Sequence, residues 1–287
     1  MLQTIHFLTE SGAKTTVENI SRAYVNNPDD YFSVLAEIKK ACVKLADDEI
    51  LILSGDEYRI TSETQKRIFE MMNSYDGIAS FDIKREITKH VKQLGLVKGA
   101  GSISVDGNNI SVSVASDSGE PLSNGGDKEL KVIFHDILSV KPSFNEYVER
   151  IKDETQSQRN TISVIPSTEH ASVIQTLVES ILRINYITGV PNLTAEEKNV
   201  VDEIKGSLES KEQQLQQAIA NSYANGTLVY LYNSSILTEQ NANQLLKDTE
   251  LRQFNNIYTR RLSGTLKDSL APQILRANST QLQSIIG

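Results

Sequence analysis

Two apolar periods alternate along the first quarter of the chain and predict helices and a β-hairpin. Residues 32–45 carry apolar side chains at spacings of three and four, as an amphipathic helix does. The apolar positions of this helix are Phe32, Leu35, Ile38, Cys42, Val43 and Leu45. Residues 50–53 and 58–60 flank a Ser-Gly-Asp-Glu turn and predict a β-hairpin.

Four pairs of residues match the capping box, which marks the start of a helix. In a capping box a Ser or Thr caps the first amides, and a Glu or Gln three residues later bonds back. Thr15 with Glu18 predicts a short first helix, and Ser62 with Gln65 predicts the last one of this segment. Ser143 with Glu146 and Thr194 with Glu197 predict the starts of two later helices. The order helix, turn, helix, hairpin, helix is typical of a winged helix, so we assign residues 1–76 to a winged-helix domain.

The next segment, residues 77–128, is predicted to be a connector made of a helix and a β-hairpin. Residues 80–96 have an amphipathic helical pattern. Residues 103–114 alternate on both sides of Asp-Gly-Asn-Asn, which indicates a hairpin. The polar stretch 116–127, with three glycines, is the best candidate for a loop at a domain boundary.

The last segment, residues 129–287, is predicted to form an α/β domain with a long helical hairpin. Strands are expected at residues 130–138, 161–166 and 227–232. Because a helix lies between the first two strands, we expect these strands to pair in parallel. A helix over residues 173–186 is followed by one long charged helix from Ala195 to about Tyr223, packed antiparallel to it. A further helix is expected over 237–262, and the polar tail ends as though cut from a larger chain.

The predicted fold class is therefore α+β. An N-terminal winged-helix domain is followed by a mixed α/β domain with a long charged helix.

Charge bears on whether the predicted winged helix contacts DNA. The chain has 29 Lys+Arg against 37 Asp+Glu, and residues 1–75 hold 8 against 12, a net of −4. The basic candidates for DNA contacts are Lys39, Lys40, Lys44 and Arg59, followed in the next helix by Lys84, Arg85 and Lys89. Since DNA binding needs cations in excess, the acidic balance favours the alternative that the module packs against protein and that its lysines are solvated.

No catalytic motif is recognisable, and we predict no catalytic residue, cofactor or metal site. Residues 11–16 contain Gly-Ala-Lys-Thr, which lacks the spaced glycines of a phosphate-binding Walker A loop. The four histidines form no His-x-x-x-His pair, and no Gly-x-Ser-x-Gly elbow occurs.

The expected location is the cytoplasm. Cys42 is the only cysteine, so no internal disulfide can form, and a reducing compartment fits best. No run of eighteen apolar residues occurs, so we expect no membrane partner.

A family resemblance rests on several phrases of the sequence in a particular order. They are the stretch SRAYVNNPDDYF at residues 21–32, ISVIP at 162–166, the helices at 173–186 and 196–220, and the strand at 228–230. In this order they resemble the region C-terminal to the ATPase core in the large P-loop ATPase family of BREX-type bacterial phage-defence systems. The family's ATP-binding loop is absent from this chain. The resemblance therefore implies a non-catalytic region that contacts other defence-system proteins or DNA.

Two hypotheses of different classes follow. The first is an interaction and scaffold region of such a phage-defence ATPase. The second is a stand-alone winged-helix transcription regulator that binds DNA, with the α/β half as a sensor domain for a ligand. An enzyme ranks third, because no motif supports one.

Overall fold

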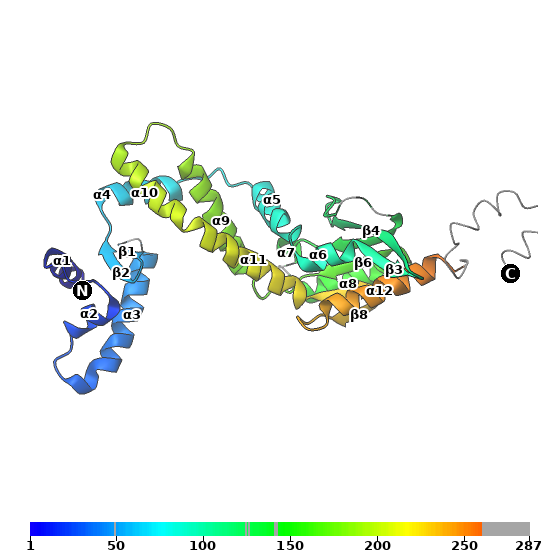
Figure 1. Ribbon diagram of the computed structural model, residues 1–287, viewed down its shortest axis with the longest axis horizontal. Helices are drawn as coiled ribbons and strands as arrows, with labels where there is room; N and C mark the ends of the chain where they lie inside the picture. Colours follow the sequence, from blue (N-terminus) through cyan, green and yellow to red (C-terminus); the bar gives the residue numbers. More distant parts are fainter. Residues whose placement is uncertain (49, 124, 126, 141–142, 260–287) are drawn as a thin grey trace, which may run out of the picture. The chain divides into compact units, whose positions relative to one another are not determined.

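The computed structural model describes residues 1–48, 50–123, 125, 127–140 and 143–259, and these residues form an α+β protein (Figure 1). The chain divides into two compact units, each built from two segments. The first unit comprises Met1–Ile78 with Ser180–Glu209, and the second comprises Ala79–Glu179 with Ser210–Gly287. The boundaries fall within helices α9 (Ala171–Thr188) and α11 (Leu208–Ala224), so each of these helices belongs to both units. The three consecutive domains proposed from the sequence stay a prediction.

The N-terminal part of the first unit is three helices, a hairpin and a fourth helix. These elements are α1 (Leu2–Glu10), α2 (Val17–Arg22), the 3₁₀ turn η1 (Pro28–Asp30), α3 (Tyr31–Asp47), β1 (Leu51–Ser54), β2 (Glu57–Ile60) and α4 (Glu63–Asn73). Strands β1 and β2 pair antiparallel, as the sequence predicts. A small core joins one buried residue from each of α1, α2, α3, β1 and β2: Ile5, Ile20, Cys42, Leu51 and Tyr58.

The start of α2 differs from the prediction. The capping residue is Thr16, whose hydroxyl accepts a hydrogen bond from the Asn19 amide at 3.3 Å, so the predicted capping box at Thr15 is wrong. Thr15 is buried instead, and its carbonyl accepts a hydrogen bond from the Tyr58 amide at 3.0 Å. This bond attaches the segment between α1 and α2 to β2. The predicted capping box at Ser62 and Gln65 is confirmed at the start of α4.

The rest of the first unit is a helical layer of α4, the second half of α9 and α10 (Ala195–Gly206). Their shared core consists of Ile68, Ile184, Ile187, Val200, Val201 and Ile204. The rings of Tyr75 and Tyr186 stack with their centroids 3.9 Å apart. The predicted capping box of Thr194 and Glu197 is confirmed at the start of α10.

The single long helix predicted from Ala195 to Tyr223 is wrong, because the chain forms two helices, α10 and α11. The helix ends at Ser207, whose amide and hydroxyl both donate to the Ile204 carbonyl, at 3.0 and 2.7 Å. Gly206 precedes it, and glycine has a low helix propensity. A serine that bonds back to the chain next to a glycine is sufficient to interrupt the helical ladder.

The second unit contains a curled, mixed six-stranded sheet in the order β3-β4-β5-β6-β7-β8. Its strands are β3 (Ser102–Val105), β4 (Asn108–Ser116), β5 (Asp127–Phe134), β6 (Thr161–Ile165), β7 (Thr227–Tyr230) and β8 (Asn233–Ile236). The neighbours β4, β5 and β6 run parallel, and the other pairs are antiparallel. The predicted parallel pair is therefore confirmed as β5 and β6, and the predicted hairpin at 103–114 as β3 and β4.

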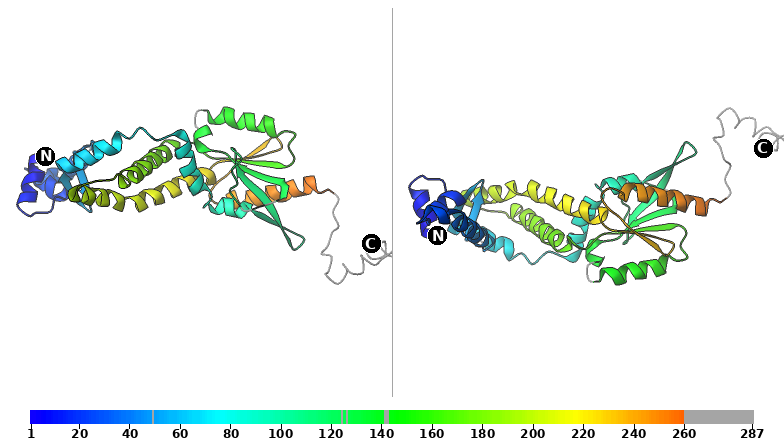
Figure 2. Two further views of the ribbon diagram at one scale, coloured as in Figure 1. Left: turned by 90° about the horizontal axis from the view of Figure 1, so that it is seen from above. Right: turned by 90° about the horizontal axis from the view of Figure 1, so that it is seen from below.

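Helices lie on both sides of this sheet, with α8 and α12 on opposite faces (Figure 2). The remaining helices of this unit are α5 (Ser80–Val91), α6 (Gly95–Ala100), α7 (Ile137–Val140), α8 (Phe144–Thr155) and α12 (Ala242–Ile257). Helix α8 packs on β6 and β7, and α12 packs on β3, β5 and β6. Because both faces are covered, every residue of β7 is buried.

Several predicted boundaries in the second unit need correction. The helix predicted over residues 80–96 ends at Val91 and is followed by the separate helix α6. The helix predicted over 237–262 begins only at Ala242, and residues 260–262 and the tail lie outside the described residues. Strand β8 was not predicted, because Asn-Ser-Ser-Ile has no apolar alternation.

Candidate functional site

The basic residues predicted on α5 are each paired with a carboxylate of the second unit. The pairs are Lys84–Asp136 at 3.1 Å, Arg85–Asp82 at 2.9 Å and Lys89–Glu86 at 2.9 Å. Hydrogen bonds, first from His90 and then from Lys89, lower the pKa of Glu86 to about 2. These carboxylates compete with any phosphate for the lysines, so α5 is poorly prepared to bind DNA.

The four basic residues predicted to contact DNA from the first unit differ from those on α5 in exposure and pairing. Lys39, Lys40 and Lys44 lie on α3 and Arg59 lies on β2, and all four are exposed. None of them makes an ion pair with a residue that the structure describes. Lys40 and Lys44 are one helical turn apart and so share one face of α3.

Large apolar side chains are exposed on the first unit. Phe32 is 80% exposed and Phe7 is 69% exposed, although both rings are wholly apolar. The others in this unit, among the described residues, are Leu2, Tyr24, Val43, Ile50, Leu53, Ile60 and Tyr186. The larger second unit exposes only Phe81, Val173, Tyr232, Ile236 and Leu251 among its described residues.

The helical pattern predicted for residues 32–45 is wrong at Phe32 and Val43. Both residues belong to the apolar set predicted for this amphipathic helix, and both face solvent. The buried position of α3 is Cys42, with Ile38 and Leu45 packed around it, because α1, α2 and the hairpin cover only one narrow stripe of the helix. An apolar set wider than one helix face is the sequence signal that could have identified these exposed side chains.

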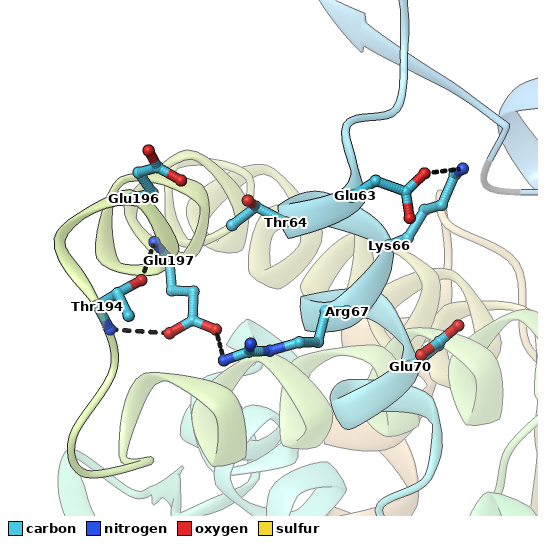
Figure 3. Close-up of a pocket in the computed structure, with 8 residues that line it drawn as sticks. All are labelled: Glu63, Thr64, Lys66, Arg67, Glu70, Thr194, Glu196 and Glu197. Atoms are coloured by element: carbon cyan, nitrogen blue, oxygen red, sulfur yellow. Dashed lines mark hydrogen bonds and ion pairs between the residues drawn. The ribbon is translucent and has the colours of Figure 1, made fainter.

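A surface groove of about 520 Å³ lies between α4 and the start of α10 in the first unit (Figure 3). The carboxylate of Glu197 points into the space between the two helices, where the Arg67 guanidinium contacts it. Glu197 also accepts a hydrogen bond from the Thr194 amide at 2.8 Å, which lowers the pKa of this carboxyl group. These contacts cap α10 and tie it to α4, so they account for the charges of Arg67 and Glu197 without a ligand.

Polar residues gather at one edge of the sheet in the second unit. Because β4, β5 and β6 are parallel, their carboxyl ends share this edge, where ligands bind in many α/β proteins. Asp117 follows β4, and His135 and Asp136 follow β5. The sequence places His135 and Asp136 at a strand end but assigns them no role; Asp117 directly after β4 and the His-Asp pair directly after β5 were a usable signal.

The two aspartates of this edge have structural partners. The Asp136 amide donates to Asp117 Oδ2 at 3.2 Å. Asp136 in turn accepts from the Leu138 amide at 3.2 Å and from the Ser139 hydroxyl at 2.9 Å, which caps α7. The cavity beside them measures only about 40 Å³. Among the described residues no cluster of three His, Cys, Asp or Glu side chains could hold a metal ion.

His135 is buried at the same edge and is held neutral. Its Nδ1 lies 2.9 Å from the Tyr147 hydroxyl, and the Tyr223 hydroxyl donates to its carbonyl at 2.7 Å. Burial lowers the pKa of His135 to about 4, against the opposing effect of Asp117. Burial likewise raises the pKa of Tyr147 to about 12. The hydrogen bonds of His135 with Tyr147 and Tyr223 connect the end of β5 to α8 and α11.

No family model, curated protein or solved structure matches the chain. In the described part of the chain, no helix combines the length and apolar character that crossing a membrane requires.

Proposed function

We propose that the chain is a non-catalytic interaction and scaffold region of a bacterial phage-defence, BREX-like P-loop ATPase, and that its first unit contacts a partner protein. The observation that carries this proposal is the set of exposed apolar side chains on an acidic first unit. Exposed aromatic rings such as Phe7 and Phe32 mark protein contacts more often than DNA contacts. The association with the ATPase family is supported by the sequence resemblance alone.

A winged-helix identity for residues 1–76 fits the same picture. Three helices followed by a hairpin support this proposal, in which α3 would contact a partner and the hairpin would be the wing; α1 is a helix that the sequence did not predict. The hydrogen bond from the Tyr58 amide to the Thr15 carbonyl holds the segment between α1 and α2 against the hairpin. In this arrangement Phe32 lies at the start of α3 and Leu53 lies in the wing.

Affinity purification from the source cells tests this proposal. A tagged chain is expected to co-purify with another protein of a phage-defence system, and a Phe7→Lys, Phe32→Lys double variant is expected to lose this partner. Both rings are mostly exposed, so their replacement leaves the core intact. The matched control is Phe81→Lys on the second unit, because Phe81 is exposed to the same 69% as Phe7.

Three outcomes would contradict the proposal. The double variant could retain the partner as well as the unmodified chain does, or Phe81→Lys could lose it equally. Recovery of partners that include no phage-defence protein would remove the family part and leave only the protein-contact part.

A second candidate function is a stand-alone winged-helix DNA-binding regulator with an α/β sensor domain. The observation that favours it is the group of exposed cations without ion pairs in the described residues, Lys39, Lys40, Lys44 and Arg59. The net charge of −4 over residues 1–75 opposes it, because neighbouring carboxylates repel phosphate.

A further inference from the structure

The two outer strands of the six-stranded sheet, β3 and β8, differ in how their surroundings cover them. At the β3 edge, α12 packs on the strand, and the Lys247 ammonium donates to the carbonyls of Gly99 and Ser102. At the β8 edge, no described residue pairs with the outer side of the strand, and all four strand residues are exposed. Of the features that protect exposed edges, β8 has only its short length of four residues, and it carries no charge, proline or bulge.

The backbone of β8 presents hydrogen-bonding groups outward at two residues. The Leu237 amide donates to the Gly226 carbonyl at 2.9 Å, so Leu237 faces β7. In an antiparallel pair, alternate residues face the partner strand, and the residues between them face away. Ser234 and Ile236 therefore direct their N–H and C=O groups to the open side, which is the arrangement that an added strand needs.

Apolar side chains flank these outward backbone groups. Ile236, on the strand itself, is 76% exposed, and Tyr232, in the preceding turn, is 48% exposed. An apolar residue of an added strand would pack against Ile236, which lies on the edge strand itself.

The turn before β8 is strained. Leu231 and Tyr232 have φ angles of 48° and 69°, in the left-handed region that favours glycine and asparagine. Leu231 and Tyr232 form the two-residue loop between the paired residues Tyr230 and Asn233, and a hairpin loop of this kind needs a positive φ at both positions. Lys152 holds Tyr232 here, with its ammonium 5.6 Å from the ring centroid.

Positive charge gathers beside the same turn. The Tyr230 hydroxyl donates to the Arg159 carbonyl at 3.0 Å and accepts from the Asn256 side-chain amide at 3.0 Å. Arg252 lies one turn before Asn256 on α12 and so shares its face. Arg159 and Arg252 are exposed, and neither makes an ion pair with a residue that the structure describes.

We propose that the open edge of β8 binds an extended strand of a partner protein, which adds to the sheet as a seventh strand. The strand it fits has an apolar residue opposite Ile236 and an acidic residue near Arg159 and Arg252. This surface belongs to the second unit and does not depend on the role proposed for the first. A second copy of this chain is a weaker fit, because β8 itself has no acidic residue to meet the arginines.

The probe is a display library of linear ten-residue peptides, selected on the full-length chain. The best peptides are then synthesised with single N-methyl groups at successive amides. If the peptide adds as a strand, N-methylation at alternate residues abolishes binding and at the residues between them leaves it unchanged, because only alternate amides face β8.

Variants of the chain locate the bound peptide. Ser234→Pro removes an outward N–H without loss of a bond to β7, and it is expected to weaken binding about tenfold or more. Ile236→Lys is expected to weaken it similarly, and because Ile236 is largely exposed this variant keeps its fold. Val173→Lys, an exposed apolar position on α9 of the same unit, is the matched control and should bind normally.

The arginines supply an independent check on the partner's chemistry. The double variant Arg159→Glu, Arg252→Glu should weaken peptides that carry an acidic residue and leave neutral peptides unchanged. The proposal is overturned if no selected peptide shows the alternating N-methyl pattern, or if Ser234→Pro and Ile236→Lys bind as well as the unmodified chain. Concentration-dependent dimerisation in ultracentrifugation that Ile236→Lys abolishes would also overturn it, because the occupant would then be a second copy.

Discussion

Glu250 is a carboxylate in the interior of the second unit. It is fully buried on α12, and its only described ionic partner is Lys247, whose ammonium lies 3.1 Å away. Burial raises the pKa of Glu250 to about 7, and the lysine opposes this effect. In the unfolded chain the same carboxyl ionises near 4.5. As pH rises from 4.5 to 7 the unfolded state loses its proton first, so the free energy of unfolding decreases across this window.

Replacement of Glu250 by glutamine is expected to remove this pH dependence. At pH 8, Glu250→Gln should raise the free energy of unfolding by up to about 3 kcal/mol, since each unit of pKa shift is worth about 1.4 kcal/mol. Below pH 4.5, variant and unmodified chain should be equally stable. Urea unfolding at several pH values measures this difference, with the exposed carboxylate variant Glu239→Gln as control. If the difference in unfolding free energy does not change with pH, the pKa of Glu250 is not raised in the folded protein.

For single residues, prediction from the sequence fails at buried polar side chains and at exposed apolar ones. The buried Glu250 and Gln253 lie on a helix that was correctly expected, but a polar residue carries no sign that it faces the core. The opposite error occurs at Phe32 and Val43, which are apolar and exposed. Both errors depend on which neighbours cover a helix face, and only tertiary contacts decide that.

At the scale of elements, prediction succeeded where the signal is local. The capping boxes at Ser62 and Thr194 are present, and each involves only the first turn of its own helix. The predicted boxes at Thr15 and Ser143 are wrong, since Thr16 caps α2 and the Ser143 side chain makes no capping hydrogen bond to α8. Prediction failed where a short segment is fixed by its neighbours. Segment 233–236 forms strand β8 because a tight turn folds it back onto β7. Helix α10 ends at Ser207, although the pattern of charged residues predicts one continuous helix.

The strained turn between β7 and β8 gives a prediction at this scale. Leu231→Asn is expected to stabilise the chain by about 1 kcal/mol, because asparagine tolerates a positive φ better than leucine. Thermal unfolding of the purified chain measures the change. The control is Thr238→Asn, an exposed position just beyond the strand and outside the set of residues with positive φ, where no gain is expected. An equal or lower midpoint for Leu231→Asn would show that Leu231 packs in a way that offsets its strain.

At the scale of the whole molecule, the α+β class and the mixed sheet follow from the sequence in outline, but the partition into units does not. Helices α4 and α10 share one core although more than a hundred residues separate them in the chain. No periodicity predicts such a contact. Tertiary contacts also decide which basic residues are free to bind a partner. The cations on α5 form ion pairs with carboxylates, and those on α3 form none with the described residues.

We expect the first unit to contact protein and not DNA, and a DNA titration distinguishes these two alternatives. The full-length chain is titrated into a fluorescein-labelled duplex of mixed sequence, and anisotropy is read at 50 mM and 200 mM salt. Low salt gives phosphate contacts their greatest strength, so weak binding there is decisive. The variants are Lys39→Glu with Lys40→Glu, and the matched control is Lys198→Glu with Lys205→Glu, two exposed lysines of the same unit.

If the first unit contacts protein, the Kd of the chain for the duplex should be weaker than about 100 µM at 50 mM salt. The two double variants should then bind the duplex equally weakly. Micromolar binding that weakens steeply with salt, and that Lys39→Glu with Lys40→Glu abolishes while the control retains it, would contradict the account. The first unit would then be a DNA-binding winged helix.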